Sequence, residues 1–181
     1  MKKILFFLSI MTIILFYFSI IKISDAQSTL NLVKNFKIIY NKESEKEKDN
    51  IIGYIKIDKL NINEKLYKID SSENNVDKHI TILKESILSD NENSIIFIAA
   101  HSGTGDIAYF KDLDKLSTND IIILNINKKN YTYIVKEMWE DPKNGYININ
   151  KEKEKQLVLT TCSPNNSKKQ LIVNCIEKES N

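Results

Sequence analysis

The sequence contains no arginine, so all 26 of its basic residues are lysines. A mechanism that needs the planar, two-point hydrogen bonding of a guanidinium group is therefore excluded. The net charge of +2 excludes the strong basic excess of a typical nucleic-acid-binding domain. Two cysteines are too few for a disulfide scaffold, whereas 42% hydrophobic residues indicate a packed core. The 181 residues allow one domain of ordinary size and a tail.

The N-terminal segment has the features of a membrane signal. Residues 4–21 carry no charge, and Lys2, Lys3 and Lys22 flank them. These eighteen residues would span about 27 Å as a helix, close to the ~30 Å hydrocarbon core of a bilayer. The lysines before the run predict a cytoplasmic N-terminus, with the rest of the chain outside the cell. We expect residues 1–25 to form a single-pass transmembrane helix in the cell membrane.

A cleaved secretory signal is the alternative interpretation of this segment. The small residues of Ser24-Asp25-Ala26 have the spacing of a cleavage site. The apolar run is longer than the ~7–15 residues of a usual secretory signal, which favours an uncleaved anchor. In both cases the remainder of the chain is exported.

The exported part is expected to consist of a stalk and one folded domain. Residues 26–50 combine apolar residues at helical spacing with the wholly polar stretch 41–50, which predicts a helical or polar stalk. Residues 51–181 predict the domain, because short β-branched and apolar runs begin at Ile51.

The runs within this domain predict a mostly β fold. Strands are expected at residues 51–57, 94–100, 120–127, 130–139, 156–162 and 170–176, and residues 60–69 are expected to contain a further, weaker strand. Apolar residues at near-helical spacing predict a short helix at residues 107–116. Seven to eight short strands with little helix predict a closed or nearly closed β-barrel.

The two cysteines fall on the last two predicted strands, too far apart for a disulfide. In an antiparallel hairpin, Cys162 faces about Leu171, and Cys175 lies some four residues further on. That offset is about 13 Å, beyond the ~7 Å Cα separation that a disulfide allows. We therefore expect two free thiols. Cys175 lies inside an apolar strand as core, whereas Cys162 ends a strand at the rim and is a candidate nucleophile.

A nucleophilic thiol needs a proton partner, and the chain has two histidines. His101 directly follows a predicted buried strand and precedes the Ser102–Gly105 loop, so it also lies at a strand end. His79 lies in the polar stretch Asp77-Lys78-His79, which is typical of a solvated surface. His101 and Cys162 are therefore the candidate catalytic pair.

Several segments of the sequence, in their order, resemble the sortases, the exported cysteine transpeptidases of Gram-positive bacteria. Residues 158–164, Val-Leu-Thr-Thr-Cys-Ser-Pro, resemble the T-L-x-T-C signature of that family. Residues 99–103 resemble its histidine segment, and residues 110–113 match the segment that follows it. Residues 52–62 resemble its opening strand pair. The resemblance extends over residues 51–178 and implies a sortase-like barrel with Cys162 and His101 as catalytic residues.

The resemblance also implies the reaction and its partners. Cys162 would attack a peptide bond in the C-terminal sorting motif of a secreted protein, an extended pentapeptide lying in a groove walled by residues 140–155. A thioacyl enzyme would form, and an amine of peptidoglycan or of a pilin would resolve it. Backbone N–H groups after Cys162 would stabilise the oxyanion. No cofactor and no metal are expected, and the His-Ser-Gly segment is similar to those of class B or class D enzymes.

The chain departs from the family at the arginine that precedes the last strand. That position falls on Lys169 or Gln170. Lys169 would supply one charge to the substrate or the oxyanion without a two-point contact, and Thr161 is a further candidate to line the site. If Lys169 is only a solvated loop charge, the alternative is an anchored binding module that retains the sortase fold with impaired catalysis.

Overall fold

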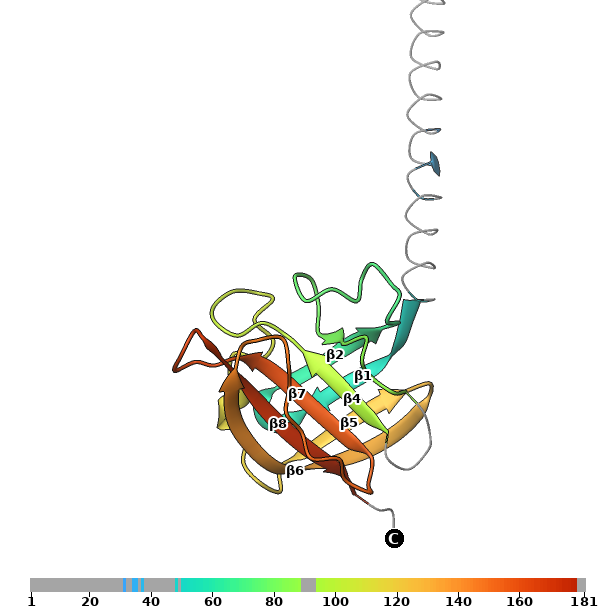
Figure 1. Cartoon of the computed structure of the whole chain (residues 1–181). Coiled ribbons are helices and arrows are strands. Elements are labelled where there is room, and N and C mark those ends of the chain that lie inside the picture. Colours follow the sequence, from blue (N-terminus) through green and yellow to red (C-terminus); the bar gives the residue numbers. More distant parts are fainter. Residues whose placement is uncertain are drawn as a thin grey trace, which may run out of the picture. The chain divides into compact units, whose positions relative to one another are not determined.

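Eight β-strands form from the β-branched and apolar runs between Ile51 and Glu177 (Figure 1). The computed structural model describes residues 31, 34, 35, 37, 48, 50–88 and 94–178. The chain divides into two compact units, Met1–Lys48 and Asp49–Asn181. The described residues of the first unit are helical. The predicted membrane helix lies outside the described residues, as does most of the predicted stalk.

No helix among the described residues is both long enough and apolar enough to cross a membrane. This finding applies to the described residues alone, so the anchor at residues 1–25 stays a prediction.

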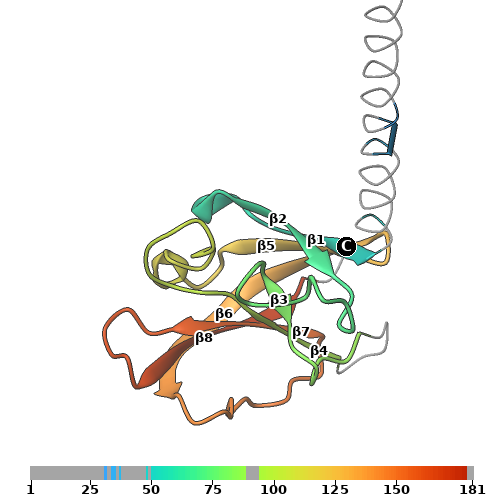
Figure 2. The ribbon, with the colours of Figure 1, turned by 90° about the horizontal axis from the view of Figure 1, so that it is seen from above.

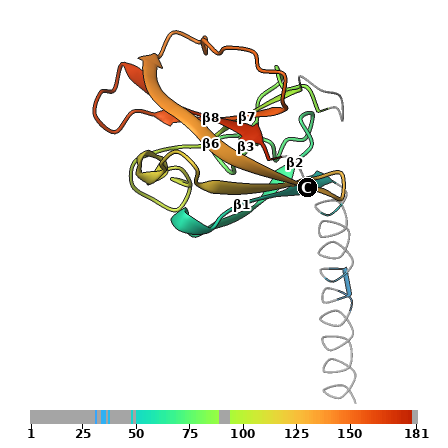
Figure 3. The same cartoon turned by 90° about the horizontal axis from the view of Figure 1, so that it is seen from below.

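The strands make one sheet, ordered β2-β1-β5-β6-β8-β7-β4-β3. Their bounds are β1 Ile51–Ile57, β2 Ile62–Tyr67, β3 Thr81–Ile82, β4 Ile95–Ala99, β5 Ile121–Ile126, β6 Lys129–Pro142, β7 Gln156–Cys162 and β8 Lys169–Glu177. The sheet curls until β3 contacts β2, so the predicted nearly closed barrel is confirmed (Figure 2). The long strand β6 runs from its partner β5 to its partner β8 across the barrel wall (Figure 3).

The interior of the barrel is filled with aliphatic side chains. Alternate residues of β1 and β5 point inward, as the period of two in a strand requires, and Ile55 and Leu124 are among the fully buried ones. Strand β7 is buried from Gln156 to Thr161. This rigid wall carries Cys162 at its end.

One strand pair fixes the position of the candidate catalytic residues. Strands β4 and β7 are parallel, and the last partners in register are Ala99 and Thr160. All other neighbours in the sheet are antiparallel among the described strands. His101 and Cys162 each follow these last partners by two residues. The parallel pairing therefore delivers both residues to the same edge of the barrel.

The structure corrects one of the expected elements. The helix predicted at residues 107–116 is wrong: the segment consists of turns and a single 3-10 turn, Leu113–Lys115. Its apolar residues Ala108, Phe110, Leu113 and Leu116 are nevertheless buried. Their spacing reflects a turn-rich segment lying on the core. The strand expected within residues 60–69 is confirmed as β2, which a 3-10 turn, Asp58–Leu60, joins to β1.

Gly53 provides a test of the packing between β1 and β5. A Cβ atom at this position would lie 1.8 Å from the carbonyl oxygen of Asn125 on β5. We expect Gly53→Ala to lower the free energy of unfolding by about 2 kcal/mol or more, since two backbones must separate. Lys56→Ala, at an exposed position of the same strand, is the matched control. Equal stabilities of the two variants in urea unfolding would refute this account.

Candidate active site

The candidate nucleophile and its candidate proton partner line one hollow at the edge of the barrel. The hollow has a volume of about 230 Å³ and is lined by Val76, Ala99, Ala100, His101, Lys143, Thr160, Thr161, Cys162 and Gln170. The Cys162 thiol is free and partly exposed, as a nucleophile must be. The geometry thus brings together the two residues that the sequence paired.

Hydrogen bonds between β4 and β7 hold the floor of this hollow. The buried hydroxyl of Thr161 donates to the carbonyl of Ala100 over 2.8 Å. The amide of Ala100 donates to the carbonyl of Thr160 over 3.3 Å. The Thr161 side chain therefore fixes the residue before His101. Its expected contact with a substrate stays a prediction.

His101 has a carboxylate partner that the sequence analysis missed. Nε2 of His101 lies 2.9 Å from Oδ1 of Asp77, which comes from the loop between β2 and β3. The amide of Asp77 donates to Asn75, and the Asn74 side chain ties the same loop to Ile82. Asp77 is thus placed to orient the imidazole. Its short polar stretch gave no signal that distinguishes it from a surface carboxylate.

His79, the second histidine, lies away from the hollow. Its ring packs against Tyr67 with a centroid separation of 4.7 Å, and its Nε2 is 3.5 Å from Glu73. The residues of this polar stretch therefore make contacts in two separate places. Asp77 contacts the candidate catalytic imidazole, whereas His79 packs on the barrel.

A lysine, also missed from the sequence, contacts the candidate nucleophile. Nζ of Lys143 lies 3.0 Å from Sγ of Cys162. Lys143 directly follows the end of β6 and opens the long connection to β7. That connection also contains Lys151, Lys153 and Lys155, so its composition did not single out one lysine. In the structure, Lys143 is distinguished by its contact with Cys162.

Lys169, expected as a candidate cation of the site, is absent from the residues lining the hollow. Its Nζ lies 3.4 Å from Glu140. The hydrogen bond from the Ser163 hydroxyl, followed by that from Lys169, lowers the pKa of Glu140 below its ordinary value. The residue of β8 that does line the hollow is Gln170, which is directly opposite Cys162 in register. The charge expected from β8 is therefore replaced there by a neutral amide.

Cys175 differs from Cys162 in every respect that controls thiol reactivity. It is fully buried on β8, and burial raises the pKa of its thiol far above the ordinary value. Both cysteines are free, which confirms the geometric argument against a disulfide. Only Cys162 is presented to reagents.

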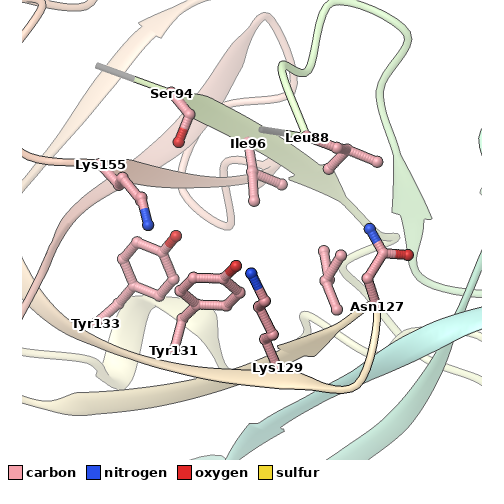
Figure 4. Close-up of a pocket in the computed structure, with 9 residues that line it drawn as sticks. Leu88, Ser94, Ile96, Asn127, Lys129, Tyr131, Tyr133 and Lys155 are labelled. Carbon is pink, nitrogen blue, oxygen red and sulfur yellow. The ribbon is translucent and has the colours of Figure 1, made fainter. Parts of the chain in front are cut away.

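Apart from the hollow around Cys162, the described residues enclose further cavities. A second cavity of about 120 Å³ lies at the other ends of β4 and β7, next to Ser94 and Lys155 (Figure 4). The ammonium of Lys155 lies 4.8 Å from the centre of the Tyr131 ring in this cavity. Among residues 50–88 and 94–178, no group of three or more His, Cys, Asp or Glu is arranged to hold a metal.

Comparison with known families identifies the barrel. A family model described as the sortase domain matches residues 55–177, more than half of the chain. The chain belongs to the sortase family. Sortases are cysteine transpeptidases, so the membership agrees with a thiol and an imidazole at one edge. A search of curated protein sequences gives no match.

Solved sortases share the fold over most of their length. Sortase C1 from Streptococcus agalactiae is 26% identical, with a TM-score of 0.62 over 73% of this chain and 69% of that one. Sortase C from Clostridium perfringens SM101 is 25% identical, with a TM-score of 0.59 over 72% and 71%. A lid mutant of sortase A from Corynebacterium diphtheriae, 18% identical, shares the fold with a TM-score of 0.64 over 72% of each chain. Class B or class D membership stays a prediction.

The contrast between the two thiols gives a direct labelling test. In the folded chain at neutral pH, we expect iodoacetamide to modify Cys162 and to leave Cys175 unmodified, because the buried thiol is both inaccessible and protonated. Denaturant should expose both sites. Mass spectrometry of the peptides checks this, with Cys175→Ala as the control for one label per chain. Modification of Cys175 in the folded protein at a comparable rate would contradict the structure.

Proposed function

We propose that this sortase is a membrane-anchored cysteine transpeptidase of the cell envelope. It cleaves the C-terminal sorting signal of secreted proteins and transfers them to an amine of the cell wall or of a pilin. The observation that carries the proposal is the free, partly exposed thiol of Cys162 sharing one hollow with His101 in a sortase barrel.

The reaction follows from the chemistry of these two groups. The thiol proton passes to the His101 imidazole as Sγ of Cys162 attacks the peptide carbonyl. A C–S bond forms, and the carbonyl electron pair moves to oxygen. When this pair returns, the C–N bond breaks, and His101 protonates the leaving amine. The acceptor amine then attacks the thioester: a C–N bond forms, the C–S bond breaks, and the proton lost by the amine passes through His101 to the Cys162 thiolate.

The outer face of β4 supports an extended peptide as the substrate. Phe97 and Ala99 lie two residues apart on that strand, so both face the same side. Ala99 lines the thiol hollow, whereas Phe97 lines a neighbouring hollow of about 200 Å³. The second hollow is also bounded by Leu83 and by Tyr146 of the connection between β6 and β7. We infer that the sorting motif lies along these two hollows, with its scissile bond at Cys162.

A related structure supports this class of substrate. The Clostridium perfringens sortase C has been determined with the C-terminal cell wall sorting motif, and it is 26% identical to this chain with a TM-score of 0.60. We propose a motif of the same kind, the C-terminal sorting motif of a secreted protein, for this enzyme. The acceptor amine and the membrane anchor of residues 1–25 are parts of the proposal that rest on the sequence.

The complete absence of arginine favours a second candidate function. In this alternative the chain is an anchored binding module that keeps the sortase fold and the peptide groove with impaired catalysis. It would bind sorting-signal peptides without forming a thioester. The two candidates therefore differ in the appearance of an acyl product.

Hydroxylamine release distinguishes the two functions. We expect the detergent-solubilised chain to convert sorting-signal peptides from a library into hydroxamates. Cys162→Ala should abolish the product, and His101→Ala should lower the rate by about 10²–10⁴-fold, the usual contribution of general acid–base catalysis. Cys175→Ala, a buried site away from the hollow, is the matched cysteine control. Peptide binding without hydroxamate from any form would establish the binding module instead.

Asp77→Asn tests the orienting contact on His101. The pair is exposed, with 76% of the Asp77 side chain accessible, so its contribution should be small. We expect the turnover rate in the hydroxamate assay to fall by up to about fivefold, with KM unchanged, since the contact concerns the imidazole and not the peptide. Asp106→Asn is the control for loss of a nearby loop carboxylate. A rise in KM alone would contradict the orienting role.

A further inference from the structure

We propose that Lys143 is the cationic residue of this active site and that it takes over, from the loop after β6, the task of the missing arginine. This inference rests on the proposed function for its substrate. Its immediate evidence is the 3.0 Å contact between Nζ of Lys143 and Sγ of Cys162. The lysine that the sequence suggested, Lys169, is paired with Glu140 and is not among the residues lining the hollow.

The loop that carries Lys143 is tied down on both sides. The amide of Lys143 donates to the carbonyl of Lys168 over 2.8 Å. Nε2 of Gln170 donates to the carbonyl of Tyr146 over 2.6 Å, and it lies 3.4 Å from the carbonyl of Pro142. Gln170 thus holds the loop at points before and after the lysine. The neutral side chain opposite Cys162 acts as a positioning residue for the charge that the loop after β6 supplies.

The other charged side chains around the thiol are engaged with partners of their own. Among the residues lining the hollow, the basic side chains are Lys143 and His101, and none is acidic. His101 is engaged by Asp77 on the side of the loop between β2 and β3. On the β8 side, Lys169 and the Ser163 hydroxyl both bind Glu140. The positive charge in direct contact with the sulfur is therefore that of Lys143.

The backbone beyond Cys162 also favours a side-chain donor for the oxyanion. The amide of Ser163 donates to the carbonyl of Lys169, and the amides of Asn165 and Asn166 both donate to the Ser163 hydroxyl. These N–H groups are therefore already engaged within the loop. The ammonium of Lys143 has three N–H donors that rotate about its Cε–Nζ bond. It can contact the sulfur first and the developing oxygen afterwards.

The step that Lys143 serves balances without any added reactant. The thiol proton moves to His101, and the resulting thiolate is stabilised by the adjacent ammonium. As the C–S bond forms, the negative charge passes from sulfur to the carbonyl oxygen, and a Lys143 N–H donates to it. Lys143 keeps its own protons throughout. The proton on His101 leaves with the amine when the C–N bond breaks.

The rate of Cys162 alkylation tests the contact without any peptide. The adjacent positive charge favours the thiolate that iodoacetamide modifies, so Lys143→Met should slow labelling at pH 7 by about tenfold. Lys143→Arg should retain the wild-type rate within about threefold, since it keeps the charge. Lys168→Met, which removes a charge from the neighbouring loop, is the matched control.

Two results would overturn the proposal. One is an unchanged rate of Cys162 alkylation in Lys143→Met. The other is an equal fall of that rate in Lys168→Met. Because alkylation requires no sorting signal, the outcome is independent of the hydroxamate assay. If no hydroxamate forms but Lys143→Met slows the alkylation of Cys162, the transpeptidase function is refuted and Lys143 remains the cation at the sulfur.

A double-mutant cycle tests Gln170 as the positioning residue. Gln170→Ala should slow alkylation at pH 7 by a smaller factor than Lys143→Met, because it loosens the loop and leaves the charge. In the Lys143→Met background it should cause no further fall, since the residue acts through the lysine. Equal effects of Gln170→Ala in both backgrounds would show an action independent of Lys143 and would overturn this part of the proposal.

Discussion

The parallel pairing of β4 with β7 is the constraint on which the active site depends. The register pairs Ala99 with Thr160, and each strand then continues for two residues to a chemically active side chain. In an antiparallel pair the two strand ends would point to opposite edges of the barrel. Here they point to one edge, and the Thr161 hydroxyl fastens the chain immediately before His101. A segment 61 residues earlier in the chain thereby supplies the candidate proton partner of Cys162.

Around this fixed pair, the charges come from loops. The loop between β2 and β3 brings Asp77 to the imidazole, and the connection after β6 brings Lys143 to the sulfur. Each loop is held by side-chain amides, Asn74 in the first and Gln170 in the second. The rigid barrel thus sets the positions of the reacting groups, whereas the amide-anchored loops set the electrostatic environment. A chain without arginine can therefore still provide a cation at its thiol.

Much of the barrel was predictable because its strands are strongly patterned. The buried run before His101 and the alternating run around Tyr133 both became strands, as β-branched and aromatic residues favour. The helix expected at residues 107–116 failed for a physical reason. Apolar residues that lie on a core from successive turns can have the same spacing as one face of a helix.

The candidate site was predictable only for residues that the strands themselves position. Cys162 and His101 follow directly from strand ends. Asp77 and Lys143 lie in polar loops, where a sequence offers many equivalent carboxylates and lysines and tertiary contacts select one. Neighbouring residues on a strand face opposite sides, so only register could show which of Lys169 and Gln170 lies beside the thiol. In the structure, Gln170 is the residue paired with Cys162.

Cross-linking of positions 101 and 162 tests whether these two residues lie close together at the same edge of the barrel. In a His101→Cys, Cys175→Ala variant, the two thiols would follow paired residues of adjacent strands, about 5 Å apart in the sheet. A short bifunctional thiol reagent should then join residues 101 and 162 within one chain, as mass spectrometry of the linked peptides would show. A Lys56→Cys, Cys175→Ala variant, with the new thiol on β1, is the control. Single-ended adducts alone in the His101→Cys variant would contradict the proposed meeting of thiol and imidazole.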